Sequence, residues 1–344
     1  MKISILGSGR WASNLAGLCL RNGHDVLTYE KIFENVPESD FFRTGKNSYI
    51  DLSRFKEEGR LILTHDLTEA IKFSDHIIIS ILSQKLDEFM QQIEQVEGYN
   101  YHKNYCIAMK GIEAITGRTL SEIMRDHGIM KNNIVVLAGP GHVQSISAGK
   151  KTHMVVAGYE TKLAETFRYI LSNDSFMLFA NPDVKGVEIC AAAKNVYGAM
   201  AGICVGSEND TLRGSLMCAS LAEMEHYLDA MQCVPKTARR LPLLGDYDAT
   251  MYDKNSHNLN YGIELVRQNT TEPKLDFVSV EGKEAVAGLI RRMINYNNQV
   301  SDSMQLKAPL LCAYSDIVKG KIEPQKAVNW IERAIQETYM LDDF

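Results

Sequence analysis

Seven short apolar runs in the first half of the chain limit the possible folds more than any other feature of the sequence. In order they are KISILGSG, HDVLTYE, RLILTHD, DHIIISIL, NYCIAMKG, NIVVLAGP and THMVVAG. Helix-forming segments lie between several of them, at residues 10–22, 84–95, 119–128 and 160–171. Short, continuously apolar strands that alternate with helices are typical of a parallel sheet covered on both faces. We therefore predict an α/β domain with a mostly parallel sheet over residues 1–182.

The second half of the chain has a different pattern, because strand-like runs stop at Asn181-Pro182. It predicts an all-helical domain over residues 183–344, with its clearest helices at 184–206, 213–231, 281–298 and 323–338. The stretch 241–262 is polar and contains Gly and Asn, so we expect a long loop there. A loop longer than about 12–15 residues in a compact domain is usually functional or disordered.

The composition indicates an ordinary globular protein and excludes several classes of function. The chain has 344 residues, of which 45% are hydrophobic and 23% charged, and this length is enough for roughly two domains. The net charge of −6 argues against nucleic acid or an anionic membrane as the main partner. No apolar run reaches the roughly 18 residues that are needed to cross a bilayer. We therefore expect no membrane insertion.

The cysteines and the first residues point to a reducing compartment. Seven cysteines are scattered without CxxC pairs, which argues against a zinc site or a disulfide framework. The first ten residues, MKISILGSGR, lack the apolar stretch and small-residue cleavage site of a signal peptide. We expect a soluble cytoplasmic protein without a bound metal.

A glycine-rich turn follows the first apolar run. Gly7, Gly9 and Ala12 form a GxGxxA version of the dinucleotide fingerprint. The first glycine allows a tight turn, the second lets the backbone approach a pyrophosphate, and the third position needs only a small residue. The helix that begins there offers free N–H groups to phosphate. The alternative is a purely structural turn, but the strand before it and the helix after it favour nucleotide binding.

The end of the second run bears on the choice of dinucleotide. Glu30 lies about 20 positions beyond the fingerprint, where an acidic residue binds the ribose 2′-OH. A carboxylate there would repel the 2′-phosphate of NADP, and the neighbouring Lys31 would partly offset that repulsion. This favours NAD, with NADP as the alternative. The two charges are otherwise only solvated groups after a strand.

Two lysines and an aspartate suggest acid–base chemistry. Lys194 lies in the apolar stretch GVEICAAAKNVYGAMAGICVG, and Lys110 follows the run NYCIAM. Apolar surroundings lower the pKa of an ammonium group and make it a usable general acid or base, while a carboxylate such as Asp246 opposes that shift. The alternatives are a snorkelling Lys194, a surface Lys110 and an Asp246 that only caps a turn.

Taken together, the motifs GSGRWA, AMKGIE, AGPGHV, AAAKNVYGAMAGI, LLGDYDATMYDKNSHN, VEG and IVKGKIEP resemble a known family. It is the bacterial type of NAD(P)-dependent sn-glycerol-3-phosphate dehydrogenase, and the resemblance covers nearly the whole chain. It implies a Rossmann-like domain that binds the cofactor and a helical domain that closes over the substrate. It also implies reduction of dihydroxyacetone phosphate to sn-glycerol 3-phosphate, and a homodimer.

The resemblance further implies roles for individual residues. Lys194 matches the proton acceptor for the glycerol 2-hydroxyl, and Asp246 and Thr250 match its hydrogen-bond network. The implied substrate contacts are Lys110, Gly139, Gly141, Asn195, Asp246, Ser256, His257 and Asn258. The implied cofactor contacts are Gly7, Gly9, Arg10, Trp11, Glu30, Lys31, Lys110, Val143, His257 and Glu281.

The chain departs from the family pattern at three positions. His257 stands where the family usually has arginine, which offers a permanent charge and a two-pronged donor to phosphate. Ala12 replaces a glycine, and Gly141 replaces a small polar residue. Two alternatives therefore stay open: a reductase of the same plan that acts on another 2-keto or 2-hydroxy compound, and a non-catalytic dinucleotide-binding module.

Overall fold

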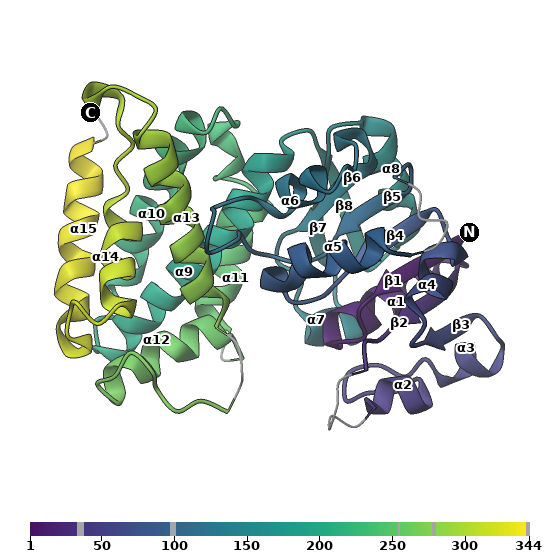
Figure 1. The fold of residues 1–344 in the computed structure, drawn as a ribbon. Coiled ribbons are helices and arrows are strands. Elements are labelled where there is room, and N and C mark those ends of the chain that lie inside the picture. The colour runs from purple at the N-terminus through teal and green to yellow at the C-terminus, as the bar shows by residue number, and fades with distance from the viewer. Residues whose placement is uncertain (33–37, 97–100, 254, 277–279, 342–344) are drawn as a thin grey trace. The chain divides into compact units, whose positions relative to one another are not determined.

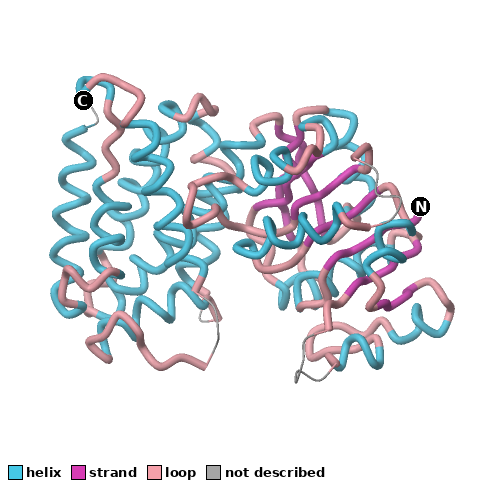
Figure 2. Tube along the Cα trace, in the orientation of Figure 1, coloured by secondary structure: helices cyan, strands magenta, loops and turns pink. Residues whose placement is uncertain are grey.

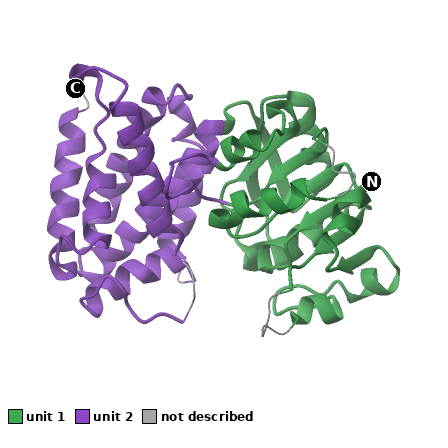
Figure 3. Ribbon diagram, viewed as in Figure 1, with its two compact units in different colours: residues 1–109, 120–184 green, residues 110–119, 185–344 purple. Residues whose placement is uncertain are grey.

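The structure, a computed structural model, describes residues 1–32, 38–96, 101–253, 255–276 and 280–341. Lys254, inside one of the motifs named above, lies outside these residues. The chain divides into two compact units (Figure 3). Unit 1 contains residues 1–109 and 120–184, and unit 2 contains residues 110–119 and 185–344. The segment 110–119 thus packs with the helical unit, although the chain on both sides of it belongs to the sheet unit.

Unit 1 is built on an eight-stranded sheet with the order β3-β2-β1-β4-β5-β6-β7-β8 (Figure 1). All neighbouring strands are parallel except β6 and β7, which are antiparallel. The strands are β1 Lys2–Leu6, β2 Asp25–Tyr29, β3 Leu61–Thr64, β4 His76–Ile79, β5 Asn104–Ile107, β6 Ile134–Ala138, β7 Thr152–Gly158 and β8 Phe176–Asn181. This confirms the predicted mostly parallel α/β sheet.

Helices cover both faces of this sheet (Figure 1). They are α1 Arg10–Arg21, α2 Asp40–Thr44, α3 Ser53–Glu57, α4 Leu67–Phe73, α5 Leu86–Glu94, α6 Leu120–Asp126, α7 Val143–Ser147 and α8 Thr161–Leu171. On one face, α1 and α8 share a core with sheet residues such as Ile3 and Val135. On the other face, Tyr29 stacks on Phe89 of α5. Burial on both faces explains why the strands are continuously apolar.

Strand β8 is an element that the sequence analysis missed. Leu178 is fully buried, but the outward-facing Met177 and Phe179 are also apolar, with exposed fractions of 46% and 45%. This segment is thus as continuously apolar as the seven runs from which strands were predicted, and the same signal was present here. Its residues pair with β7 in the register Thr152↔Phe176 to Ala157↔Asn181.

Unit 2 is helical, apart from the segment 110–119 and its loops (Figure 2). Its main helices are α9 Val184–Gly206, α10 Leu212–Ala230, α11 Asp246–Tyr252, α12 His257–Arg267, α13 Glu281–Asn297, α14 Pro309–Val318 and α15 Ala327–Leu341. Every residue of α9 from 186 to 204 is buried. This helix forms the centre of the unit, because its apolar residues belong to one core together with those of α10, α13, α14 and α15.

The length of α9 corrects one expectation from the sequence. By length and composition, Val184–Gly206 is apolar enough to cross a membrane, although we had expected no such run. However, 89% of its most apolar window is buried inside the protein. Its character is thus explained by its position at the centre of a helical unit, where all sides of a helix are covered.

The prediction of a long loop over residues 241–262 is wrong. The structure has a π-helical turn at Leu241–Gly245, followed directly by α11, and α12 begins at His257. Leu243, Tyr247 and Met251 recur at intervals of four and are almost completely buried, which is the spacing of a helix face. The polar residues between these three positions made the segment look like a loop, and the helical spacing was overlooked.

Candidate active site

The glycine-rich turn of unit 1 has the geometry of a phosphate-binding turn. Gly7 has a φ of +128°, and a Cβ there would lie 2.0 Å from the backbone oxygen of Ser80. Only glycine fits this position. A Cβ on Gly9 would meet none of the described atoms within 4 Å, so the space beside the turn is open. Helix α1 begins at Arg10, and no side chain of the described residues caps its first N–H groups.

The register between β1 and β2 places Glu30 beside this turn. Leu6 pairs with Tyr29, so the next residues of the two strands, Gly7 and Glu30, follow side by side. The Ser8 hydroxyl donates a hydrogen bond to Oε1 of Glu30. The other oxygen, Oε2, is buried and has no hydrogen-bond partner among the described residues. A buried carboxylate oxygen without a partner is costly, and a ribose hydroxyl would satisfy it.

Lys31 is directed toward α5. Its ammonium group lies 3.4 Å from Oε1 of Gln92 and 3.9 Å from Oε1 of Glu88. The Lys31 ammonium group is thus held by two acceptors on α5. In this position it is less able to offset the repulsion between Glu30 and a 2′-phosphate. Together, the open turn and the unpartnered Glu30 oxygen fit a dinucleotide with a free ribose hydroxyl.

A second turn, after β6, lies against the first one. Gly139 has a φ of +126° and accepts a hydrogen bond from the Gly141 N–H at 2.8 Å. A Cβ on Gly141 would lie 2.5 Å from the sulfur of Met154 and 3.0 Å from the Trp11 ring. The absence of a side chain at Gly141 therefore lets Trp11 pack on this turn. Val143, the predicted cofactor contact, begins the short helix α7 directly after it.

In unit 2, two ammonium groups converge on one carboxylate. Lys110 Nζ lies 2.5 Å from Oδ2 of Asp246, and Lys194 Nζ lies 3.5 Å from Oδ1. Lys194 also donates to the Thr250 hydroxyl at 3.2 Å, which in turn donates to the Asp246 backbone oxygen at 2.7 Å. Exposed fractions are 8% for Lys194 and 1% for Asp246. The structure thus brings together the four residues that were predicted to be catalytic.

Charge and burial set the proton affinity of Lys194. Burial lowers the pKa of its ammonium group below the ordinary lysine value, and the charge of Lys110 lowers it further. The carboxylates of Asp246 and Glu281 oppose this change. An amine held between these influences can release and take up a proton more readily than a surface lysine.

Asn195, the residue after Lys194, is held in a second hydrogen-bond network. The Asn195 amide donates to Oε2 of Glu281 at 2.8 Å and accepts from the Asn258 amide at 3.0 Å. Asn258 also accepts from the Gly282 N–H at 3.0 Å. These bonds join α9, α12 and the start of α13, and they fix the two asparagine amides. Glu281, the predicted cofactor contact, is therefore bonded to Asn195.

The remaining predicted residues of unit 2 lie where α12 begins. The Ser256 hydroxyl caps this helix by accepting the Leu259 N–H at 3.3 Å. His257 is the first residue of the helix and is half-buried. Asn258 follows and is buried. The three residues predicted to bind phosphate are therefore consecutive at one helix N-terminus.

Three glycines of α9 are residues whose role the sequence analysis missed. A Cβ on Gly198 would lie 2.9 Å from the Thr250 methyl group, and one on Gly202 would lie 2.1 Å from the Leu259 backbone oxygen. A Cβ on Gly206 would lie 2.8 Å from the Ile263 oxygen. Their spacing of four residues lets α11 and α12 approach α9 closely enough for Thr250 to reach Lys194. The Gly-x-x-x-Gly repeat was a signal that could have revealed this.

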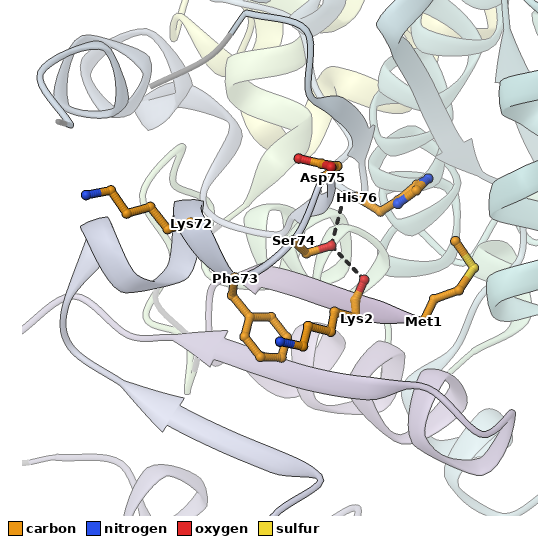
Figure 4. Close-up of a pocket in the computed structure, with 7 residues that line it drawn as sticks. All are labelled: Met1, Lys2, Lys72, Phe73, Ser74, Asp75 and His76. Carbon is orange, nitrogen blue, oxygen red and sulfur yellow. Dashed lines mark hydrogen bonds between the residues drawn. The ribbon is translucent and has the colours of Figure 1, made fainter. Parts of the chain in front are cut away.

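Unit 1 also has a hollow whose lining contains none of the site residues of unit 1 named above (Figure 4). It is at the amino-terminal ends of β1 and β4, the opposite end of β1 from the glycine turn. The Ser74 hydroxyl donates to the Lys2 backbone oxygen at 2.6 Å and accepts from the His76 N–H at 2.9 Å. The Ser74 hydroxyl is thus already bonded on both sides within the hollow, and we assign the hollow no role. It is lined by Met1, Lys2, Lys72, Phe73, Ser74, Asp75 and His76.

Comparison with known proteins gives one consistent result over most of the chain. The family NAD-dependent glycerol-3-phosphate dehydrogenase N-terminus matches residues 2–164, and the corresponding C-terminus family matches residues 183–329. Glycerol-3-phosphate dehydrogenase [NAD(P)+] of Pediococcus pentosaceus is 30% identical over 332 residues, which are 95% of this chain and 96% of that protein.

Two further proteins are similar to this chain, one in sequence and one in fold. Glycerol-3-phosphate dehydrogenase [NAD(P)+] of Staphylococcus epidermidis is 27% identical over 330 residues, which are 95% of this chain and 96% of that protein. The crystal structure of the Coxiella burnetii glycerol-3-phosphate dehydrogenase has the same fold, with a TM-score of 0.78 at 20% identity. It covers 99% of this chain and 98% of its own.

Proposed function

The chain belongs to the NAD-dependent glycerol-3-phosphate dehydrogenase family, and we propose that it interconverts dihydroxyacetone phosphate and sn-glycerol 3-phosphate with NAD(P). The observation that carries the proposed mechanism is the convergence of the buried Lys194 and the half-buried Lys110 on Asp246 in unit 2. A carbonyl reduction needs a proton donor for the oxygen that becomes a hydroxyl, and Lys194 is suited to this task.

The proposed mechanism assigns the proton to Lys194. When bound, the nicotinamide supplies a hydride to the substrate C2, or takes one back in the reverse direction. As ammonium, Lys194 donates its proton to the C2 oxygen, and the free amine accepts that proton when the alcohol is oxidised. Asp246 and Thr250 orient the amine. One proton and one hydride are thus added to the ketone.

Lys110 and Asn195 stabilise the charge that develops on the C2 oxygen. The Lys110 ammonium group and the Asn195 amide are both held by carboxylates, those of Asp246 and Glu281. Donors that are fixed before the reaction need little reorganisation when charge develops. We assign the phosphate to Ser256, His257 and Asn258 at the start of α12, and the backbone of Gly139 and Gly141 to the substrate as well.

Cofactor binding is assigned chiefly to unit 1. Gly7, Gly9 and the first N–H groups of α1 would hold the pyrophosphate. Glu30 would accept the ribose hydroxyl through its unpartnered oxygen. The further cofactor contacts that we propose are Arg10, Trp11, Lys31, Lys110, Val143, His257 and Glu281.

We predict a preference for NADH over NADPH that depends on Glu30. Glu30→Gln removes the charge that repels a 2′-phosphate and weakens the bond to the ribose hydroxyl. A hydrogen bond to a charged group contributes about 1.5–3 kcal/mol, so the preference should fall by about 10- to 100-fold. The readout is the Kd of each cofactor from its fluorescence in the absence of substrate. The exposed Glu57→Gln is the matched control, and equal loss of both affinities would contradict the assignment.

The proposed function itself is tested with pairs of substrates. With NADH, kcat/KM for dihydroxyacetone phosphate should exceed that for dihydroxyacetone, which lacks only the phosphate, by on the order of 10³, because binding energy from the phosphate is used at the reacting carbon. Pyruvate and other 2-keto acids serve as further comparisons. A non-phosphorylated ketone that is turned over faster than dihydroxyacetone phosphate would overturn the substrate assignment.

A second candidate function is reduction of another 2-keto compound on the same plan. The observation that favours it is His257, at the start of α12, in a position where the family usually has arginine. Histidine carries a charge only in part near neutral pH, so it holds a phosphate dianion less firmly. The same panel of substrates separates the two candidates.

We also propose that the protein is a soluble cytoplasmic homodimer without nucleic acid or membrane partners. The burial of α9 and the net charge of −6 support the absence of membrane and nucleic acid partners. The dimer rests on the family resemblance alone. Light scattering of the purified chain measures its mass in solution, and a mass of one 38.6 kDa chain would rule the dimer out.

A further inference from the structure

Residues 111–119, which we name the brace, hold the backbone next to Lys110. The brace is a short hairpin in which Ile112 forms an antiparallel bridge with Thr119, and the Glu113 N–H donates to the Arg118 oxygen at 2.9 Å. Ile112 is fully buried in the core of unit 2. The hairpin is therefore anchored in the helical core, immediately after Lys110.

The brace rests on the middle of α13, where glycine allows the two backbones to touch. A Cβ on Gly288 would lie 2.5 Å from the Ile112 side chain and 2.7 Å from the Glu113 oxygen. A Cβ on Gly117 would lie 2.7 Å from the Arg292 backbone nitrogen. Distances under 3.0 Å to backbone atoms leave no room for a side chain at either glycine. The backbones are thus in close contact at both glycines, and we name this part of α13, residues 288–295, the seat of the brace.

Directed hydrogen bonds fix the brace on this seat. The Arg292 guanidinium donates to the Gly117 oxygen at 3.0 Å, and the Asn295 amide donates to the Thr116 oxygen at 3.1 Å. Within the brace, the Arg118 guanidinium donates to both carboxylate oxygens of Glu113, at 2.9 and 3.0 Å. Paired donors of this kind are geometrically specific and strong. The brace is therefore stiff as well as anchored.

We propose that the brace and its seat on α13 are a positioning device for Lys110, which holds its ammonium group on Asp246 and beside Lys194. This inference rests on the proposed function, since it concerns the proton transfer assigned to Lys194. The same helix, α13, begins with Glu281, which is bonded to Asn195. One rigid helix thus supports Lys110 from its middle and Asn195 from its first residue.

A displacement of the brace should be measurable as a change in the pKa of Lys194. Burial lowers the pKa of its amine most, and of the three charged groups around it, Asp246 on α11 and Glu281 on α13 raise this pKa while Lys110 beside the brace lowers it further. If the brace shifts, Lys110 moves away and Asp246 is left to Lys194, so that the pKa of Lys194 rises. A purely structural defect elsewhere would not move this pKa.

The test is Gly288→Ala, with Gly214→Ala as the matched control. Gly214 lies in the exposed part of α10, and a Cβ there would meet none of the described atoms within 4 Å. A displacement of about 1 Å can cost about 10²-fold, so we expect kcat for dihydroxyacetone phosphate reduction to fall by about 10- to 100-fold. The alkaline limb of its pH profile should move to higher pH. All properties of the Gly214→Ala control should stay unchanged.

A second pair of variants covers the case in which Gly288→Ala does not fold. Arg292→Ala removes a donor to the brace, and Arg292→Lys retains one. We expect Arg292→Ala to show the same fall in kcat and the same move of the alkaline limb to higher pH. In the absence of ligands, its backbone amides over residues 111–119 should exchange faster than those of the wild type. Arg292→Lys should restore part of the lost kcat. An unmoved pH limb in every folded variant would overturn the proposal. If the wild-type protein does not reduce dihydroxyacetone phosphate at all, the proposed function fails instead.

Discussion

Lys194→Ala should lower kcat for dihydroxyacetone phosphate reduction by on the order of 10² or more, the usual contribution of a positioned general acid. The C2 oxygen must receive a proton as the hydride arrives, and without the amine only water is available to donate it. Because Lys110 and Asn195 remain in place, the KM should change much less than kcat. Steady-state kinetics in both directions measure the two effects separately.

Two controls separate this loss from damage to the fold. Lys185→Ala removes a half-buried lysine in the first turn of the same helix and should leave kcat unchanged. Lys194→Met should be as inactive as the alanine variant, yet its melting temperature should equal or exceed that of the wild type, because a buried ammonium group is costly. Near-normal turnover of Lys194→Ala would show that another group supplies the proton.

Asp246→Asn should have the second largest effect, and it should reduce both stability and activity. The carboxylate accepts from two ammonium groups and is 1% exposed. Removing one partner of a buried ion pair costs about 3–5 kcal/mol, since it leaves uncompensated charge. We also expect kcat to fall by about 10²-fold, because Lys110 and Lys194 lose the group that aligns them.

The pH profiles of Asp246→Asn should shift in a direction that follows from the pKa of Lys194. Asp246 raises the pKa of Lys194, so its loss leaves the ammonium form less favoured. Ketone reduction needs the ammonium form, and its alkaline limb should therefore move to lower pH. Oxidation needs the free amine, and it should persist to lower pH than in the wild type.

The stability of the folded Asp246→Asn variant should also depend on pH. A lysine whose pKa is lower in the folded state binds fewer protons there than in the unfolded chain, so stability rises as pH rises toward the ordinary lysine range. The melting temperature of Asp246→Asn should thus increase between neutral and alkaline pH more than that of the wild type. Asp248→Asn, an exposed position on the same helix, should show none of these changes. If both limbs stayed fixed in Asp246→Asn, Asp246 would not act on Lys194.

Much of the fold and the central cluster could be predicted because the relevant signals are local. The first strand, the glycine turn and α1 are adjacent in the sequence, so their pattern already defines the turn seen at Gly7. Lys194 stands out because its neighbours are small and apolar, and the structure confirms its burial. The pairing of Lys110 with Asp246 could not come from spacing, since 136 residues separate them. The family resemblance implied only that Asp246 and Thr250 lie in the hydrogen-bond network of Lys194, so the bond between Lys110 and Asp246 is a finding of the structure.

Other features depend on packing that the sequence pattern does not reveal. Helix α11 was mistaken for a loop because its exposed face is polar, and the buried period of Leu243, Tyr247 and Met251 is short. The brace follows the strand β5 in the chain yet packs with unit 2, since Ile112 is buried in the helical core. Its contacts with α13 join residues that are far apart in the sequence.

Chemical rescue of Lys194→Ala by small primary amines tests the proposed role of Lys194 most directly. The removed side chain leaves space for methylammonium or ethylammonium beside Asp246 and Thr250. Our account predicts that dihydroxyacetone phosphate reduction recovers in a saturable manner, in proportion to the protonated form of the amine, while Lys185→Ala does not respond. A variant that binds substrate and NADH normally, but gains no rate from any amine at any pH, would contradict it.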